Sequence, residues 1–157
     1  MNDDWALFRI DDRLIHGQIV TVWIAELQIK RILIIDDVLA EDLFLQNVYR
    51  YSAPPSITID ICSIKEGPEF YKSDNSTTST MVIVRSPAAA MQLFEIGFPL
   101  KHINIGALGS TPERERYYKN ISISTLELET LRKLQEYGIR IYFQRVPSEP
   151  PKSLEPS

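Results

Sequence analysis

The sequence predicts an α/β protein with an open, mainly parallel twisted sheet and helices on both faces. Short runs of apolar, β-branched residues alternate along the chain with segments of helical periodicity. The runs at residues 32–35 and 81–84 are apolar throughout, which is typical of strands covered on both faces. Strands and helices that alternate in this way form a mostly parallel sheet between two helical layers.

The first part of the chain contains two predicted strands and one predicted helix. Residues 5–10 are a short apolar strand, and the polar segment 11–17 ends in glycine and is expected to be a loop. Residues 18–27 place their apolar side chains mainly on one broad face, as a helix packed on a sheet does. Residues 32–35 follow as a buried strand.

The middle of the chain continues the alternation. Residues 41–51 have helical period and end before two prolines, and 57–61 alternate as a strand does. Residues 63–71 are an ambiguous helix because Gly-Pro interrupts them. Residues 73–80 are a polar surface loop before the strand at 81–84. The buried side chains expected on the helix at 41–51 are Leu43, Phe44, Val48 and Tyr51.

The last part contains two further helices between strands. Residues 88–96 form a helix, which a proline in its first turn and a glycine after its end both favour. Residues 102–105 and 121–123 are strands. A Ser-x-x-Glu capping box begins the helix at 125–137, and residues 139–143 are the last strand.

The length of 157 residues indicates one domain, which we place at residues 1–147. Residues 148–157 are rich in proline and poor in apolar side chains, so we expect a disordered tail. In an open α/β sheet the ligand site lies outside the carboxyl ends of the strands. The loops that follow strands are therefore where chemistry is expected.

Composition excludes several classes of protein. The formal charge of −4 argues against a general nucleic-acid binder. No metal-ligand spacing and no glycine-rich cofactor fingerprint is found, so we expect neither a metal nor a cofactor. The acidic N-terminus is unlike a secretory signal, and no apolar run is long enough for a membrane helix. We therefore expect a cytoplasmic protein.

The densest polar cluster is residues 9–18, in and around the first strand-to-helix loop. It contains His16, and a neutral imidazole is a natural carrier of a labile phosphoryl group near neutral pH. Such an acceptor needs a partner that orients the ring, cations and N–H groups that hold the phosphoryl oxygens, and access for a donor. The candidate residues for these roles are Asp11, Asp12, Arg13, Gly17 and Gln18. The alternative is a solvated loop whose histidine packs against Trp23.

The segment from Arg9 to Trp23, Arg-Ile-Asp-Asp-Arg-Leu-Ile-His-Gly-Gln-Ile-Val-Thr-Val-Trp, resembles the signature of a bacterial phosphotransferase-system family. This family is the enzyme IIB component of the mannose/fructose/sorbose type, which belongs to the phosphoenolpyruvate-dependent sugar phosphotransferase system (PTS). Further similarity follows in the right order at Ile-Leu-Ile-Ile-Asp-Asp, Ala-Pro-Pro, Asn-Ile-Gly and Tyr-Gly-Ile. The resemblance spans roughly residues 5–147.

The resemblance implies a phosphocarrier with sugar phosphotransferase activity. His16 would take a phosphoryl group from a histidine of the IIA component, on the ring nitrogen nearer the backbone, and pass it to a sugar held by the membrane components IIC and IID. The family fold is an open, mainly parallel sheet, its members are commonly dimers, and they work at the inner face of the membrane. A regulatory phosphoprotein of the same fold is the alternative.

We expect a pocket beside His16, and three further residues are candidates for its rim: Arg9, Asp36 and Gly106. Asp36 also has an alternative role as a helix start. After Gly106 the chain continues with Ala107 and Leu108 where the family usually has glycine and methionine, which puts this loop in doubt as a close ligand contact. Arg85 also departs from the family pattern, and we interpret it as a surface charge rather than a phosphate contact.

A response-regulator receiver domain is the other family that an acidic pair after a strand indicates. Asp36 and Asp37 follow a strand in this way. A receiver then needs an acceptor aspartate at the end of a later strand, but the strand at 81–84 ends in Arg85-Ser86. We therefore reject this interpretation.

Overall fold

The computed structural model describes residues 5–72 and 79–156, without the side chains of residues 18 and 19. Residues 1–4, and residues 73–78 of the predicted polar loop, lie outside the described part. The main sheet contains β1 (Leu7–Asp11), β2 (Arg31–Ile35), β3 (Thr58–Cys62), β4 (Thr80–Val84), β5 (His102–Ala107), β8 (Arg140–Phe143) and β9 (Lys152–Ser153). A separate hairpin consists of β6 (Arg114–Tyr118) and β7 (Ile121–Ser124).

The predicted helices are present, with shifts at their ends that are largest for the ambiguous helix at 63–71, and a short helix at 37–40 was not predicted. They are α1 (Gly17–Leu27), α2 (Asp37–Ala40), α3 (Leu43–Ser52), α4 (Gly67–Lys72), α5 (Pro87–Glu95) and α6 (Thr125–Glu136). The capping box is confirmed, since the Ser124 side chain accepts from the Glu127 backbone N–H and the Glu127 side chain accepts from the Ser124 N–H. None of the helices in the described segments has the length and the apolar composition that crossing a membrane requires.

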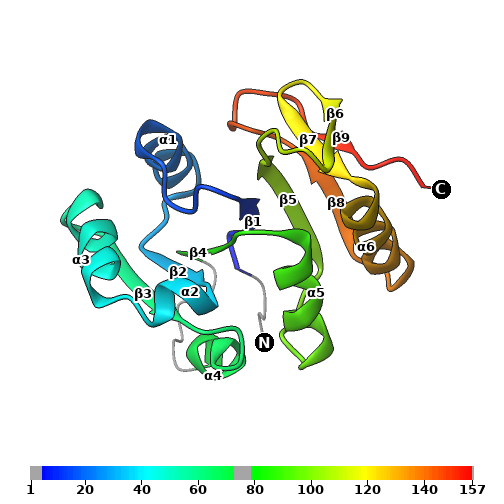
Figure 1. The fold of residues 1–157 in the computed structure, drawn as a ribbon. Helices are drawn as coiled ribbons and strands as arrows, with labels where there is room; N and C mark the ends of the chain where they lie inside the picture. Colours follow the sequence, from blue (N-terminus) through cyan, green and yellow to red (C-terminus); the bar gives the residue numbers. More distant parts are fainter. Residues whose placement is uncertain (1–4, 73–78, 157) are drawn as a thin grey trace.

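The strand order of the main sheet is β3-β2-β4-β1-β5-β8-β9, and all neighbours are parallel except β8 and β9. The α/β fold with a mainly parallel sheet is thus confirmed (Figure 1). After β1 the chain runs to β2 on one side, whereas after β5 it runs to β8 on the other. Loops that leave neighbouring strands in opposite directions open a crevice at the strands' carboxyl ends, which is where such sheets bind ligands.

Hydrophobic side chains pack on both faces of the sheet, because successive residues of a strand point to opposite sides. One core joins the sheet to α1 and α2 through Leu7, Val20, Trp23 and Leu39. The other core joins it to α4, α5 and α6. Its members include Phe8, Tyr71, Ala90, Leu93 and Leu131. The apolar runs of β2 and β4, residues 32–35 and 81–84, are buried by these two layers, as predicted.

The prediction for the apolar residues of α3 is wrong. Leu43, Phe44, Val48 and Tyr51 are exposed, and Gln46 is the buried residue of this helix. The Gln46 amide donates to the carbonyl oxygens of Leu39 at 2.9 Å and Ala40 at 3.1 Å. These bonds turn a polar side of α3 toward the end of α2, so hydrophobic periodicity alone indicated the wrong face.

The prediction of a disordered tail over residues 148–157 is also wrong for the part that the structure describes. β9 pairs antiparallel with β8, and Leu154 is buried. The Gln135 side chain donates to the Leu154 carbonyl at 2.9 Å. The tail contains few apolar residues, but Leu154 packs in the core, and the backbone of β9 adds an edge strand to the sheet.

Candidate functional site

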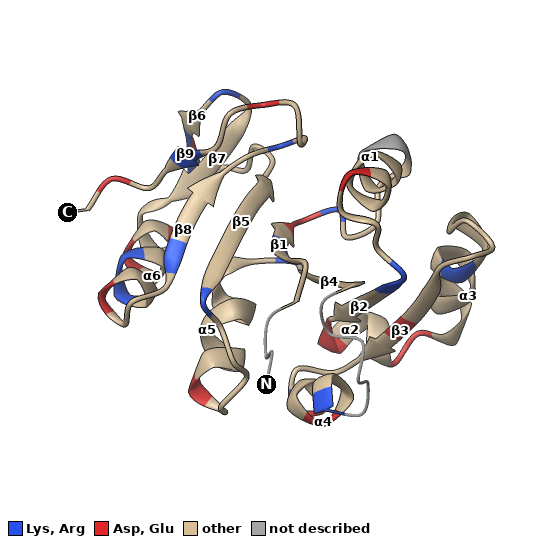
Figure 2. Ribbon diagram, turned by 180° about the vertical axis from the view of Figure 1, so that it is seen from behind, with Lys and Arg blue, Asp and Glu red and all other residues tan. Residues whose placement is uncertain are grey.

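The loops after β1, β5 and β8 meet at the carboxyl edge of the sheet, beside the crevice between β1 and β5. Figure 2 shows the acidic and basic residues that follow one another between β1 and α1. Between β1 and β5 the register shifts by one residue, so Ile10 is opposite Ile105 but Asp11 is opposite Ala107. Gly106 is the extra residue of this bulge.

Asp11 connects the first loop to two arginines. One carboxylate oxygen accepts from the Arg13 backbone N–H at 3.0 Å and from Arg13 Nε at 3.4 Å. The other accepts from Arg9 Nη2 at 3.3 Å. Asp11 is buried, whereas 41% of the Arg13 side chain is exposed. Arg13 is therefore held in position at its base while its guanidinium stays accessible.

Arg9 lies beneath the pocket and not at its rim. It is buried, and Nη1 donates to Asn104 Oδ1 at 2.8 Å and to the Gln144 carbonyl at 3.2 Å. Burial lowers the pKa of Arg9, while the negative charge of Asp11 acts in the opposite direction. Its guanidinium also lies over the Trp23 ring, 5.7 Å from the centroid. Arg9 thus ties β1 to β5 and to the chain after β8.

Gly106 lines the pocket directly above Arg9, and this contact explains why the position requires glycine. A β-carbon at Gly106 would overlap the Arg9 guanidinium. The backbone of β5 can pass over the buried arginine only where no side chain is present.

His16 is exposed at the start of α1. It is the N-cap residue of the helix in extended backbone conformation, and its side chain makes no capping hydrogen bond. Just before it, Leu14 has φ 58° and is fully buried, which anchors a left-handed backbone conformation in the loop. Gly17 follows with φ 36°. The structure describes the backbone of Gln18 in α1 but not its side chain.

Asp12 binds the loop after β5 rather than the imidazole. Its Oδ2 accepts from the Gly109 N–H at 2.7 Å and from Arg114 Nη1 at 3.1 Å. Arg114 forms a two-point ion pair with Glu127, with both nitrogen–oxygen distances 2.9 Å. Throughout the described residues, the hydrogen bonds of the Asp11 and Asp12 carboxylates go to these partners and not to His16.

Asp36 lies outside the pocket, where it begins α2. Its Oδ2 accepts from the Leu39 N–H at 3.0 Å, which is the helix-start role considered above. Arg85 binds the same carboxylate at two points, 3.1 and 3.3 Å, and donates to the Asp12 carbonyl at 3.3 Å. Arg85 is exposed, as its interpretation as a surface charge expects, but it also connects the ends of β2, β4 and β1.

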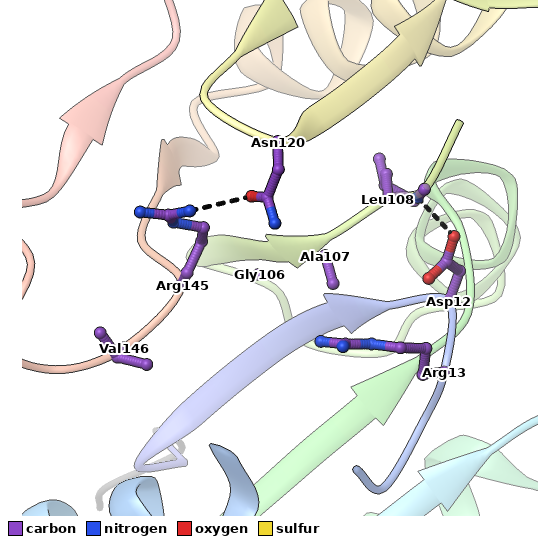
Figure 3. Close-up of a pocket in the computed structure, with 9 residues that line it drawn as sticks. Asp12, Arg13, Gly106, Ala107, Leu108, Asn120, Arg145 and Val146 are labelled. Atoms are coloured by element: carbon purple, nitrogen blue, oxygen red, sulfur yellow. Dashed lines mark hydrogen bonds between the residues drawn. The ribbon is translucent and has the colours of Figure 1, made fainter. Parts of the chain in front are cut away.

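A pocket of about 370 Å³ opens beside Arg13 (Figure 3). Its walls come from the loops after β1, β5 and β8 and from the turn between β6 and β7. The lining residues are Asp12, Arg13, Gly106, Ala107, Leu108, Gly109, Asn120, Arg145 and Val146. Two arginines, an amide and a carboxylate thus face one cavity. Arg13, which lines the cavity, precedes His16 by three residues in the sequence.

Three residues of this region were not predicted: Arg114, Asn120 and Arg145. Arg145 stands two residues after the end of β8, so the rule that ligands lie at carboxyl ends of strands could have indicated it. Arg114 belongs to β6, a strand of alternating charges that we did not predict. Asn120 is in the β6–β7 turn, and no sequence pattern places that turn over the pocket.

Comparison with known proteins identifies the family. The sequence matches the family described as "PTS system sorbose subfamily IIB component" over residues 5–156. It is 28% identical to the fructose-specific EIIB component of Bacillus subtilis over 145 residues, 92% of this chain and 89% of the relative. It is also 28% identical to the sorbose-specific EIIB component of Klebsiella pneumoniae over 146 residues, with the same coverage of 92% and 89%.

Solved structures have the same fold. The IIBSor domain of the sorbose permease from Klebsiella pneumoniae superposes with a TM-score of 0.85 at 27% identity, over 94% of this chain and 91% of that domain. The manxB protein of Thermoanaerobacter tengcongensis gives 0.85 at 30% identity, over 96% and 92%. Because the family match covers nearly the whole sequence, the chain belongs to the sorbose-subfamily IIB components of the phosphotransferase system, the phosphocarriers of sugar uptake.

Proposed function

We propose that His16 accepts a phosphoryl group from a phosphohistidine of the IIA component and passes it to a sugar during uptake. The observation that carries this proposal is the exposed imidazole at the start of α1, three residues after an arginine that lines a polar pocket. Because the donor is a separate protein, the His16 imidazole has to be exposed for the donor to reach it.

In the first step a neutral imidazole nitrogen of His16 attacks the phosphorus of the donor. A new N–P bond forms as the donor's N–P bond breaks, and the donor imidazole leaves. Both bonds are of one kind, so the step is close to thermoneutral and the protein has to position groups and stabilise charge. Arg13 supplies two-point binding of phosphoryl oxygens, and the free N–H groups at the α1 start, at Gly17 and Gln18, supply further donors.

In the second step a hydroxyl oxygen of the sugar attacks the phosphorus, the His16 N–P bond breaks, and the hydroxyl proton passes in net terms to the released imidazole. The sugar is presented by the membrane components IIC and IID, which places the reaction at the inner face of the membrane. Asp11 and Asp12 contribute indirectly, because they hold Arg13 and the loop after β5. A homodimer belongs to the same proposal, and light scattering of the purified chain tests it.

Labelling with phosphorylated IIA tests the assignment. His16→Ala should abolish acid-labile phosphorylation while its melting curve stays like that of the wild type, because the ring is exposed and makes no cap bond. Normal labelling of this variant would disprove the proposal. Arg13→Ala should accept phosphate more slowly, and His102→Ala is the matched control because it removes the only other histidine of the chain.

A further inference from the structure

We propose that Arg85 is a positioning residue for phosphoryl transfer: it holds the peptide unit that precedes Arg13, and Asp36 anchors it there. The inference rests on the proposed function, in which Arg13 binds the phosphoryl oxygens. It assigns a part in the reaction to two residues outside the β1–α1 loop, since Arg85 directly follows β4 and Asp36 directly follows β2.

The peptide unit between Asp12 and Arg13 is hydrogen-bonded at both of its polar groups. Its carbonyl oxygen, which belongs to Asp12, accepts from Arg85 Nη1 at 3.3 Å. Its N–H, which belongs to Arg13, donates to Asp11 Oδ1 at 3.0 Å. Because a peptide unit is planar, bonds at its two opposite sides fix its orientation and the place of the Arg13 α-carbon. Asp11 and Arg85 together therefore determine where the Arg13 side chain leaves the loop.

Asp12 is bound from both strands that neighbour β1 in the sheet. On the β5 side its N–H donates to the Ala107 carbonyl at 3.1 Å, and its carboxylate accepts from Gly109 and Arg114. On the β4 side its carbonyl accepts from Arg85. The loop is thus clamped between its two neighbours, and removal of the Arg85 side chain would release the clamp on one side.

Arg85 is itself fixed by Asp36. Its Nε and Nη2 donate to the two oxygens of the Asp36 carboxylate, while Nη1 binds the Asp12 carbonyl. The Asp36 side chain is only 10% exposed, and its backbone N–H donates to the Cys62 carbonyl at the end of β3, at 2.9 Å. Hydrogen bonding to Asp36 raises the pKa of Arg85 although burial opposes the rise, so the guanidinium stays charged. A charged fork held at two points by a fixed carboxylate is preorganised to bind a third group.

Single-turnover transfer from phosphorylated IIA to the purified full-length chain tests the inference. Arg85→Gln should lower the rate constant at saturating donor about 3–10-fold, the effect of losing one hydrogen bond of ordinary net strength. The half-saturating donor concentration should stay unchanged, because a contact of the transition state is misplaced and docking is not. Arg140→Gln is the matched control and should behave as wild type, because Arg140 is an exposed arginine at the first residue of β8, on the amino edge of the sheet.

Two double-mutant cycles test the route through which Arg85 acts. Asp36→Asn removes the charge of the anchor but keeps the helix start, since asparagine caps a helix about as well as aspartate does. It should slow transfer as Arg85→Gln does, and the two changes together should cost little more than either alone. In the Arg13→Ala background, Arg85→Gln should have little further effect, because its effect passes through Arg13.

NMR relaxation provides a readout that does not depend on phosphorylation. The order parameter of the Arg13 backbone N–H should fall in Arg85→Gln and in Asp36→Asn, and should keep its wild-type value in Arg140→Gln. An unchanged order parameter in Arg85→Gln would overturn the inference.

The kinetic outcomes separate the alternatives. A merely structural role of Arg85 would lower the melting temperature of Arg85→Gln and leave the rate constant of the folded protein unchanged, and a role in donor docking would raise the half-saturating concentration. Either result, or equal slowing with and without Arg13, would overturn the inference. Failure of wild type to be labelled on His16 would instead overturn the proposed function, and the relaxation measurement would still test whether Arg85 positions Arg13.

Discussion

Replacing Gly106 with alanine tests whether the buried arginine under the site determines this position. The added β-carbon would overlap the Arg9 guanidinium. That guanidinium has little freedom to move, because it is bound to Asn104, Asp11 and the Gln144 carbonyl and is stacked near Trp23. Gly106→Ala must therefore displace a buried cation or bend β5.

The expected cost follows from these contacts. Overpacking a core costs about 1–3 kcal/mol, and breaking a buried ion pair costs about 3–5 kcal/mol. We therefore expect Gly106→Ala to lower the free energy of unfolding by about 3–5 kcal/mol. For a domain of this size each kcal/mol lowers Tm by about 2–4 °C, so the Tm should fall by about 6–20 °C.

Urea unfolding followed by circular dichroism measures the change, with thermal melting as the second readout. Gly109→Ala is the matched control. A β-carbon there would meet only Asp12 Oδ2, at an ordinary contact distance of 3.5 Å, and should cost less than about 1 kcal/mol. If the two variants are equally stable, Gly106 is not required by Arg9 and the reasoning is wrong.

Three further perturbations follow from the structure. Leu154→Ala should lower the free energy of unfolding by about 2–3 kcal/mol in urea denaturation, because this leucine of the tail is buried in the core; no loss would mean that the tail is not packed. Burial opposes ionisation of Glu127, but hydrogen bonds from Arg114 and Ser124 outweigh it, so its folded pKa lies below the ordinary value. Its stabilisation is therefore complete above the unfolded pKa, near 4.3, and is lost as pH falls through the lower folded pKa. Glu127→Gln should be less stable at neutral pH and lose less stability on acidification, and parallel stability curves against pH would contradict this. Burial, aided by the charge of Glu66, raises the pKa of Cys62 to about 12, so a thiol reagent at pH 8 should react only as the protein unfolds; rapid labelling of the folded chain would show that the thiol is accessible.

Local sequence patterns correctly predicted those strands and helices that are determined by residues adjacent in the sequence. The apolar strands β2 and β4, the capping box of α6 and the glycine that ends the first loop are examples. The prediction failed for α3, where a hydrogen-bonded Gln46 decides which face turns inward. It also failed for the tail, where a single leucine and an edge strand provide the order.

The sequence by itself determined the fold class and the place of a histidine and an arginine between the first strand and the first helix, because these depend on local periodicity and on a contiguous motif; that the histidine is exposed was decided by the tertiary structure. Only the tertiary structure decided that Arg9 is buried beneath Gly106, that Asp12 binds Arg114 across 102 positions of the chain, and that Arg145 faces the pocket. These contacts join segments distant in sequence, and the parallel strand order that brings their ends together is set by the packing of the whole sheet.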